Sequence, residues 1–204
     1  MGKQLILASA SPRRREILTV TGYSFTVRPT DADENITGLT PDALVQELSL
    51  RKAKAALAAA GEDDVIVAAD TVVALDGEIL GKPKDADDAV RMLTALSGRS
   101  HSVFTGFTVC SKTQPSVTRV VEAKVTMRPL LPEEIAAYVA TGSPLDKAGA
   151  YGMQEAAGPF VASIHGDYYS IVGLPICPLS VILRSFGITP NLQPANTTHS
   201  EIIL

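Results

Sequence analysis

The sequence predicts a mixed α/β fold in which helices cover the faces of a sheet, and three observations support this prediction. In the first half of the 204-residue chain, segments with helical periodicity alternate with short apolar runs. The middle of the chain carries hairpin signals instead, so the sheet is not expected to be purely parallel. Hydrophobic residues make up 46% and charged residues 20% of the chain, which is the balance of an ordinary folded domain.

The first elements are a strand and a helix joined by a tight turn. Residues 4–8 form a short apolar run that predicts a strand. Ser11 suits the N-cap of a following helix, and Pro12 suits its first helical position. Gly22 is placed to end this helix. The pattern therefore predicts a strand, a serine-containing turn and a helix N-terminus within the first fifteen residues.

A second helix and a buried strand follow. Thr40 and Pro41 open the helix by the same logic, and Gly61 ends it. Residues 65–69 are all apolar, as expected of a central strand that is covered on both faces. We expect this strand to end at Ala69, directly before Asp70.

The next signals indicate a hairpin and a third helix. Residues 71–80 are expected to form two strands around Asp76 and Gly77, because Asp-Gly is a strong signal for a tight hairpin turn. Asp85 is expected to cap the helix, and Gly98 is expected to end it.

The second half of the chain alternates between strand and helix patterns again. Its expected elements are two long paired strands (101–110 and 117–127), a short helix (132–141), a structured loop (143–158), a strand (160–164) and a last helix (176–186). We expect residues 1–188 to form one domain and residues 189–204 to form a mobile tail.

Charge and cysteine content exclude several classes of protein. The 22 acidic and 18 basic residues give a net charge of -4, which argues against a nucleic-acid-binding surface. No run of about 18 apolar residues predicts a membrane span, and the N-terminal apolar run is too short for a secretion signal. Cys110 and Cys177 are interpreted as reduced core residues. A cytoplasmic protein is therefore expected.

The first candidate site lies at the start of the first helix. Arg13, Arg14 and Arg15 stand in its first turn, where the helix dipole disfavours bases. A bound anion would offset this penalty, since arginine and helix N-terminal N–H groups both bind phosphate. The arginines can also bend into solvent, and the local sequence does not decide between the two possibilities.

Asp70 is the second candidate, because it directly follows the buried strand. Ligands of α/β sheets gather near the carboxyl ends of strands, and an Asp there can hold a metal ion or act as a general base. Taken alone, such an Asp more often caps a turn or pairs with a base.

The remaining polar candidates are weaker. Lys82 lies next to the hairpin, but no Walker A spacing surrounds it. Lys52 is most simply interpreted as part of the solvent-exposed face of the second helix, and Glu34 as an acidic residue of a loop. Gln154 can both donate and accept hydrogen bonds, so it could contact the edge of a base. Asp146 and Lys147 are interpreted most simply as a surface ion pair.

Taken together, these segments resemble the Maf family from residue 5 to about residue 186. The resemblance is carried by spaced motifs in order: Ser9-Ala10-Ser11-Pro12-Arg13-Arg14, Ala69-Asp70-Thr71, Leu80-Gly81-Lys82-Pro83, Leu96-Ser97-Gly98, His101 to Gly106, Asp146 to Gly152, and Val172-Gly173-Leu174-Pro175. Ser170 departs from the pattern, because Asn is common at this position.

The resemblance implies a nucleoside triphosphate pyrophosphatase that uses a divalent cation, Mg²⁺ or Mn²⁺, to release a monophosphate and pyrophosphate. It also implies two lobes on a long mixed sheet with a central cleft, similar to inosine triphosphate pyrophosphatases, and a possible homodimer. Asp70 is then the proton acceptor, and Glu34 and Asp70 hold the metal. The positions that match substrate or phosphate contacts are Ser9, Arg13, Arg14, Lys52, Lys82 and Gln154.

The same resemblance carries an expected specificity. Arg13, Thr71 and Gln154 are the residues of the branch that acts on dTTP and UTP, rather than the branch that acts on 7-methyl-GTP. Two alternatives stay open at this point: a nucleotide-binding regulator of cell division that does not turn nucleotide over, and a phosphatase or kinase that acts at the γ-phosphate.

Overall fold

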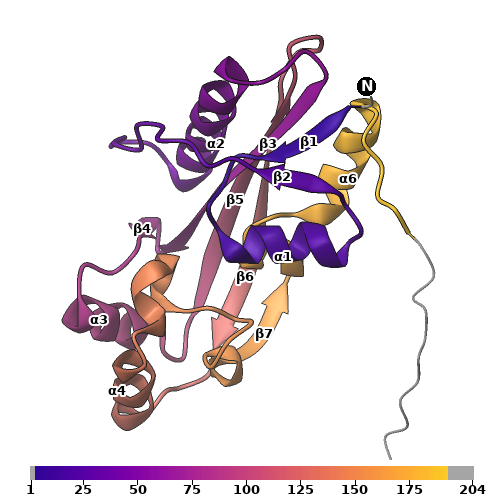
Figure 1. Ribbon diagram of the computed structural model, residues 1–204. Coiled ribbons are helices and arrows are strands. Elements are labelled where there is room, and N and C mark those ends of the chain that lie inside the picture. Colours follow the sequence, from indigo (N-terminus) through magenta and orange to yellow (C-terminus); the bar gives the residue numbers. More distant parts are fainter. Residues whose placement is uncertain (1–2, 193–204) are drawn as a thin grey trace, which may run out of the picture.

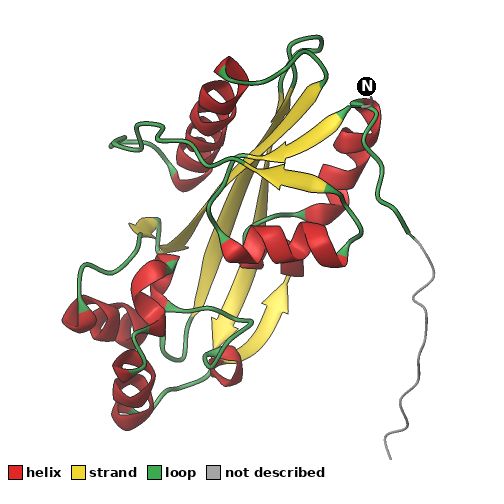
Figure 2. Cartoon of the chain, in the orientation of Figure 1, coloured by secondary structure: helices red, strands yellow, loops and turns green. Residues whose placement is uncertain are grey.

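A computed structural model describes residues 3–192, which form one open sheet of seven strands with helices on both faces (Figures 1 and 2). The strand order is β2-β1-β3-β5-β6-β7, and β4 pairs with the end of β3. The pairs that β1 makes with β2 and β3 are parallel, and all others are antiparallel. The predicted mixed sheet is thus confirmed. The strands are β1 (Gln4–Leu7), β2 (Phe25–Val27), β3 (Asp64–Leu75), β4 (Glu78–Leu80), β5 (Ser100–Cys110), β6 (Val117–Met127) and β7 (Val161–His165).

The helices divide between the two faces of the sheet. Their bounds are α1 (Pro12–Val20), α2 (Pro41–Ala58), α3 (Ala86–Leu96), α4 (Pro132–Ala140), α5 (Tyr168–Val172) and α6 (Ile176–Ser185). Helix α2 packs on one face, while α1, α5 and α6 pack on the opposite face (Figure 1). Helices α3 and α4 cover the far end of the long strands.

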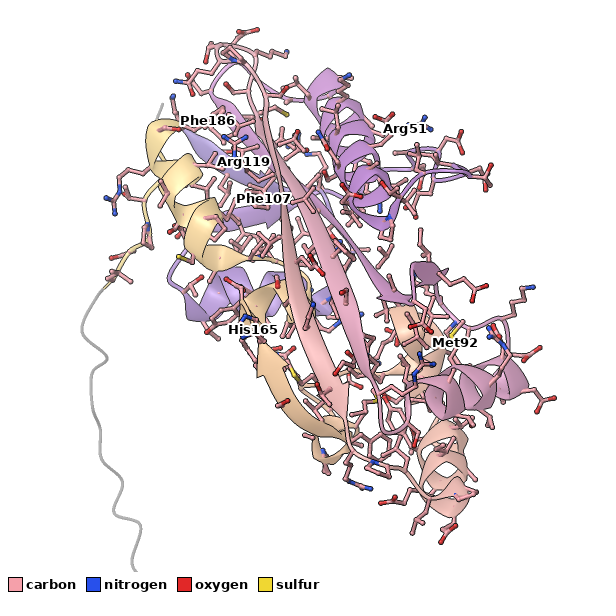
Figure 3. All side chains as sticks on the ribbon, turned by 180° about the vertical axis from the view of Figure 1, so that it is seen from behind. Arg51, Met92, Phe107, Arg119, His165 and Phe186 are labelled. Carbon is pink, nitrogen blue, oxygen red and sulfur yellow. The ribbon has the colours of Figure 1, made fainter. Side chains whose placement is uncertain are left out.

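The alternation of side chains along β3 explains this arrangement, because successive side chains of a strand point to opposite faces. Ile66 and Ala68 pack with α2 in one core. Val67 packs on the other face with α1 and α6, and Phe107 and Phe186 belong to that core (Figure 3). Further along the same face, β3 enters a separate core with α3 and α4. The long strands therefore carry two cores on one face.

The strand that precedes Asp70 is longer than predicted. It does not end at residue 69, because Asp70 and Thr71 continue the antiparallel ladder opposite Gly106 and Thr105 of β5. Strand β1, however, ends at Leu7, opposite residue 67 of β3. Asp70 therefore lies just beyond the carboxyl end of the parallel part of the sheet, although it lies inside its own strand.

The predicted hairpin is confirmed. Asp76 and Gly77 both have positive φ, 52° and 84°, and they connect the antiparallel strands β3 and β4. Such a pair of positive φ values is what a two-residue hairpin turn requires. Strand β2 and helix α5, which are three and five residues long, were not predicted from the sequence.

Three further expectations concern the surface and the chain end. Cys110 is buried, but Cys177 is exposed on α6, so the prediction that both lie in the core is wrong for Cys177. Most of the predicted tail, residues 193–204, lies outside the described residues. Before that point, the Asn191 amide donates to the Gly22 carbonyl at 2.8 Å. Across the described part of the chain, no helix combines the length and the apolar character needed to span a membrane.

Candidate active site

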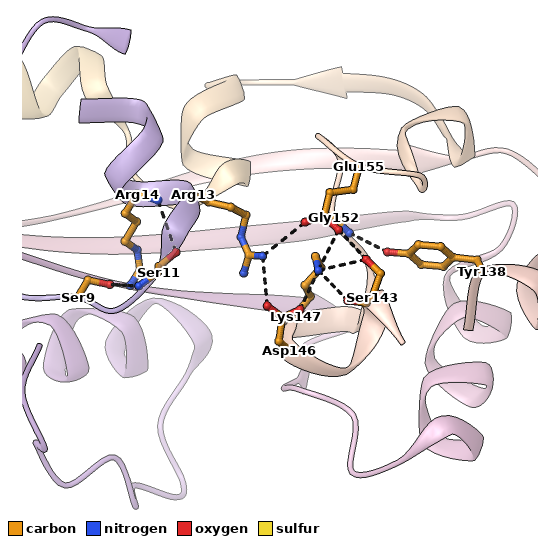
Figure 4. A network of polar contacts seen from close by, with 10 residues as sticks. All are labelled: Ser9, Ser11, Arg13, Arg14, Tyr138, Ser143, Asp146, Lys147, Gly152 and Glu155. Atoms are coloured by element: carbon orange, nitrogen blue, oxygen red, sulfur yellow. Dashed lines mark hydrogen bonds and ion pairs between the residues drawn. The ribbon is translucent and has the colours of Figure 1, made fainter. Parts of the chain in front are cut away.

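The turn between β1 and α1 builds the first part of the site. Ser11 caps the helix, since its side chain accepts from the Arg14 amide. The Ser9 hydroxyl accepts from the Ser11 amide at 3.2 Å and from Arg14 Nη1 at 3.1 Å (Figure 4). A serine oxygen has two acceptor positions and one proton. Both acceptor positions are occupied, so the Ser9 proton remains available for an anionic oxygen.

Arg14 is turned from the helix onto the sheet instead of into solvent. Its Nε donates to the Gly173 carbonyl at 2.8 Å, and its Nη2 donates to Thr71 Oγ1 at 3.4 Å. With the bond to Ser9, three of its five N–H groups are used and two remain. The solvent alternative for this arginine is therefore wrong, and its free donors lie beside the helix N-terminus.

The charges around Arg14 act on its pKa in opposite directions. Desolvation lowers this pKa, and the charge of Arg13 acts in the same direction. The carboxylates of Asp70 and Glu34 oppose both effects and raise it. The arginine of α1 thus interacts electrostatically with acidic groups that come from β3 and from the loop between β2 and α2.

Lys52 of α2 joins these two carboxylates. Its Nζ lies 2.5 Å from Asp70 Oδ1 and 3.0 Å from Glu34 Oε1. The side chains of Lys52 and Asp70 are only 12% and 14% exposed. Asp70 therefore pairs with a base, as such an Asp commonly does. The pair is also the centre of a polar cluster that includes two predicted metal ligands and a predicted phosphate ligand.

A glycine in the neighbouring strand allows α2 to bring Lys52 so close. Gly106 lies opposite Asp70 in the ladder. A Cβ at Gly106 would lie 2.3 Å from the Val45 carbonyl oxygen and 2.5 Å from its carbon, so the helix backbone lies directly against the strand at this point. In the sequence Gly106 is only the last residue of a motif, and its role in positioning the site becomes visible in the packing of α2 against β5.

Arg13 extends in the opposite direction from Arg14, toward the loops that follow α4 (Figure 4). Its Nη1 lies 3.6 Å from Asp146 Oδ2 and 3.8 Å from Glu155 Oε1. These distances describe ion pairs without a close hydrogen bond. Arg13 therefore connects the start of α1 to the segment that carries Gln154.

Lys147 organises that segment from inside. Its Nζ donates to Asp146 Oδ1 at 2.7 Å and to the Ser143 carbonyl at 2.7 Å, and it lies 3.0 Å from Glu155 Oε2. Lys147 is buried, so the interpretation of residues 146 and 147 as a simple surface pair is wrong. Gly152 leaves room for it, since a Cβ there would lie 2.7 Å from Lys147 Cε.

The pKa values of the two carboxylates follow from this network. Desolvation raises the pKa of Asp146, but the hydrogen bond and charge of Lys147, with the charge of Arg13, bring it below its ordinary 3.8. Desolvation likewise raises the pKa of Glu155, and the hydrogen bonds from Ser143 and Lys147 outweigh this effect, so its pKa lies below 4.5.

We expect Lys147→Met to lower the free energy of unfolding at neutral pH by about 1.5–3 kcal/mol, because charge-assisted hydrogen bonds of a buried ammonium are lost. Carboxylates with lowered pKa values stabilise the folded state above their ordinary pKa, and this contribution disappears as pH falls through the folded-state value. Urea unfolding between pH 6 and pH 3 should therefore show a shallower pH dependence in the variant. Lys112→Met, which removes an exposed partner of Glu62, is the matched control. Equal pH profiles for wild type and Lys147→Met would contradict this role.

Lys82 and Gln154 are not brought into these clusters. Both side chains are exposed and make no hydrogen bond or ion pair to any of the described residues. Their loops nevertheless border the site: the Gly149 amide donates to the Gly81 carbonyl at 3.0 Å, and Gln154 precedes Glu155. The structure thus joins Ser9, Arg14 and Thr71 in one group of contacts and Lys52, Asp70 and Glu34 in another, while Arg13, Lys82 and Gln154 border these groups.

Other potential metal ligands do not gather elsewhere. Within residues 3–192, no group of three or more His, Cys, Asp or Glu side chains is arranged to hold a metal ion. His101 is buried, with its Nε2 2.7 Å from Tyr151 Oη, and burial lowers the pKa of His101 to about 4. This histidine is neutral at physiological pH.

The fold and the site define an α/β protein that carries a cluster of basic groups and carboxylates at the end of its parallel strands. The chain belongs to the family of Maf-like proteins, whose model matches residues 4–186. It is 47% identical over 187 residues to a dTTP/UTP pyrophosphatase of Moorella thermoacetica, covering 91% of this chain and 96% of the relative. It is 46% identical to a dTTP/UTP pyrophosphatase of Bacillus pumilus, with coverage of 92% and 98%.

A solved structure supports the fold independently. The Ham1 protein of Staphylococcus aureus superposes with a TM-score of 0.54 at 17% sequence identity, over 90% of this chain and 99% of that chain. At this identity the likeness concerns the fold alone. It confirms the expected mixed sheet with flanking helices.

Proposed function

We propose that this protein hydrolyses dTTP and UTP between the α- and β-phosphates, which releases the nucleoside monophosphate and pyrophosphate. The observation that carries the proposal is the pairing of Lys52 with Asp70 and Glu34 at the end of the parallel strands, within electrostatic range of Arg14. Relatives that are 46–47% identical over nine-tenths of this chain are dTTP/UTP pyrophosphatases. The membership in the Maf-like family supports the same class of reaction.

The roles of the residues follow from their chemistry. Asp70 accepts a proton from the attacking water, which adds to the α-phosphorus as the bond to the leaving pyrophosphate breaks. The Ser9 hydroxyl, whose proton is uncommitted, donates to a phosphate oxygen, and the positive charge of Arg14 attracts the triphosphate. Lys52 stabilises negative charge that develops on the phosphates. Such positioning and charge compensation are the main tasks in phosphoryl transfer.

Glu34 and Asp70 are suitable ligands for a divalent cation. Both carboxylates reach the same ammonium, so their oxygens face a common space. Mg²⁺ is usually bound by one or two carboxylates together with substrate phosphates, and Glu34 and Asp70 would supply the protein part of this donor set. We propose that these residues hold Mg²⁺ or Mn²⁺ with the nucleotide. A bound cation would neutralise phosphate charge. Arg13, Lys82 and Gln154, which border the site, are proposed to contact the substrate as it binds.

The test is to identify both products from a panel of nucleotides. The purified protein is incubated with Mg²⁺ and with dTTP, UTP, CTP, dATP, GTP or 7-methyl-GTP in turn. We expect monophosphate and pyrophosphate from dTTP and UTP. Release of inorganic phosphate would instead indicate attack at the γ-phosphate. Binding of dTTP and UTP without turnover would contradict the proposed activity and favour a regulatory binder.

A further inference from the structure

A chain of hydroxyl groups behind Arg14 has a defined direction. Thr105 of β5 is fully buried, and its Oγ1 lies 2.7 Å from the Ser170 carbonyl oxygen and 2.8 Å from Thr71 Oγ1. A carbonyl oxygen can only accept, so the single proton of Thr105 is donated to Ser170. Leaving this carbonyl unpaired in the interior would be costly. Thr105 must therefore accept its second hydrogen bond from Thr71.

The direction of this chain decides what Thr71 can offer to a ligand. Its proton is committed to Thr105, and one of its acceptor positions is taken by Arg14 Nη2. Thr71 is half-buried, and these two bonds leave its hydroxyl oxygen with one acceptor position. A phosphate oxygen without a proton would meet this acceptor unfavourably. The group that contacts Thr71 must be a donor.

Arg14 complements this acceptor with donors. Two of its N–H groups are uncommitted, and they lie on the guanidinium that contacts Thr71. The site therefore presents a donor directly beside an acceptor. The edge of uracil and thymine has the matching pattern, since their N3–H donor is flanked by carbonyl acceptors. Cytosine has an acceptor at N3, which does not match the acceptor that Thr71 presents.

We propose that Thr105 is a positioning residue that makes Thr71 an obligate acceptor, so that Thr71 and Arg14 select the imide edge of uracil or thymine. The inference rests on the proposed function and extends it to base discrimination. The two substrates dTTP and UTP differ at C5 of the base and at the 2′ position of the sugar. A site that takes both must recognise what they share, and the imide edge is the part that CTP lacks.

The decisive experiment compares kcat/KM for UTP and CTP in three variants of buried β5 threonines. Thr105→Val frees the Thr71 proton, which can then be donated to N3 of cytosine, so the UTP-to-CTP preference should fall about tenfold, the value of one hydrogen bond. Thr105→Ser keeps the hydroxyl and should keep the preference. Thr108→Val is the matched control, because Thr108 is also fully buried but bonds Ser49 and Thr118.

Each outcome bears on the inference separately from the proposed function. An unchanged UTP-to-CTP ratio in a folded Thr105→Val protein would overturn it, while UTP hydrolysis itself would stand. N3-methyl-UTP lacks the donor, so wild-type protein should use it at least about tenfold less well than UTP. Equal use would overturn the inference even if Thr105→Val failed to fold. If UTP were not hydrolysed, calorimetry with UMP and CMP would replace turnover, and equal affinities would again refute it.

Discussion

Replacing Asp70 by Asn should lower kcat for dTTP and UTP by about 10²–10⁴-fold, the usual contribution of a positioned general base. The amide has almost the same shape, but it cannot accept the proton of water and it loses the ion pair with Lys52. The effect on KM should be smaller, since the base acts mainly in the transition state. Pyrophosphate release under saturating and limiting substrate separates the two constants.

Asp76→Asn provides the matched control for this experiment. Asp76 is in the turn at the end of the same strand, and it pairs with Arg99 on the surface. Its φ of 52° suits Asn as well as Asp. The control should retain wild-type kcat, which would show that the loss of any one carboxylate near β3 does not by itself lower kcat. Near-normal kcat with a raised KM in Asp70→Asn would refute the role of Asp70 as proton acceptor.

Gly106→Ala should destabilise the protein by about 1–3 kcal/mol or more, the usual cost of overpacking. The added methyl group would lie 2.3 Å from the Val45 carbonyl oxygen, and a helix backbone cannot rotate away as a side chain can. Helix α2 must shift, and Lys52 moves with it relative to Asp70. We therefore expect lower kcat together with a lower urea midpoint.

Gly61→Ala separates this effect from the general cost of replacing glycine. Gly61 is exposed, and a Cβ there would lie 3.5 Å from Asp64 Oδ2, which is ordinary contact. Its unfolding free energy should stay within about 0.5 kcal/mol of wild type. If Gly106→Ala showed wild-type stability and kcat, close packing of α2 would not be what places Lys52.

Elements with a strong local signal were predicted well, and short elements that depend on partners were not. The start of α1 is specified by Ser11 and Pro12, and the hairpin by Asp76 and Gly77. Strand β2 has only three residues, too few to show a period of two, and it exists through its pairing with β1. The true length of β3 is likewise set by its pairing with β5.

The site shows the same division. The resemblance to a family identified Ser9, Arg14, Lys52 and Asp70, and the structure brings them into two adjacent clusters. The role proposed for Thr105 could not be predicted from the sequence, because a buried threonine in a strand has no local signature of function. Thr105 forms hydrogen bonds with Thr71 and Ser170, which are separated from it by 34 and 65 positions in the sequence.

The sequence by itself determined the class of fold, the family and most of the polar residues of the site, because capping residues, turn glycines and spaced motifs are local properties of the chain. Only the tertiary structure decided how these residues are used. The alternation along β3 sends Asp70 toward α2 and Thr71 toward Arg14, on opposite faces of one strand. Which residues lie on each face of the strand depends on the packing of elements that are distant in sequence, and no local pattern contains that information.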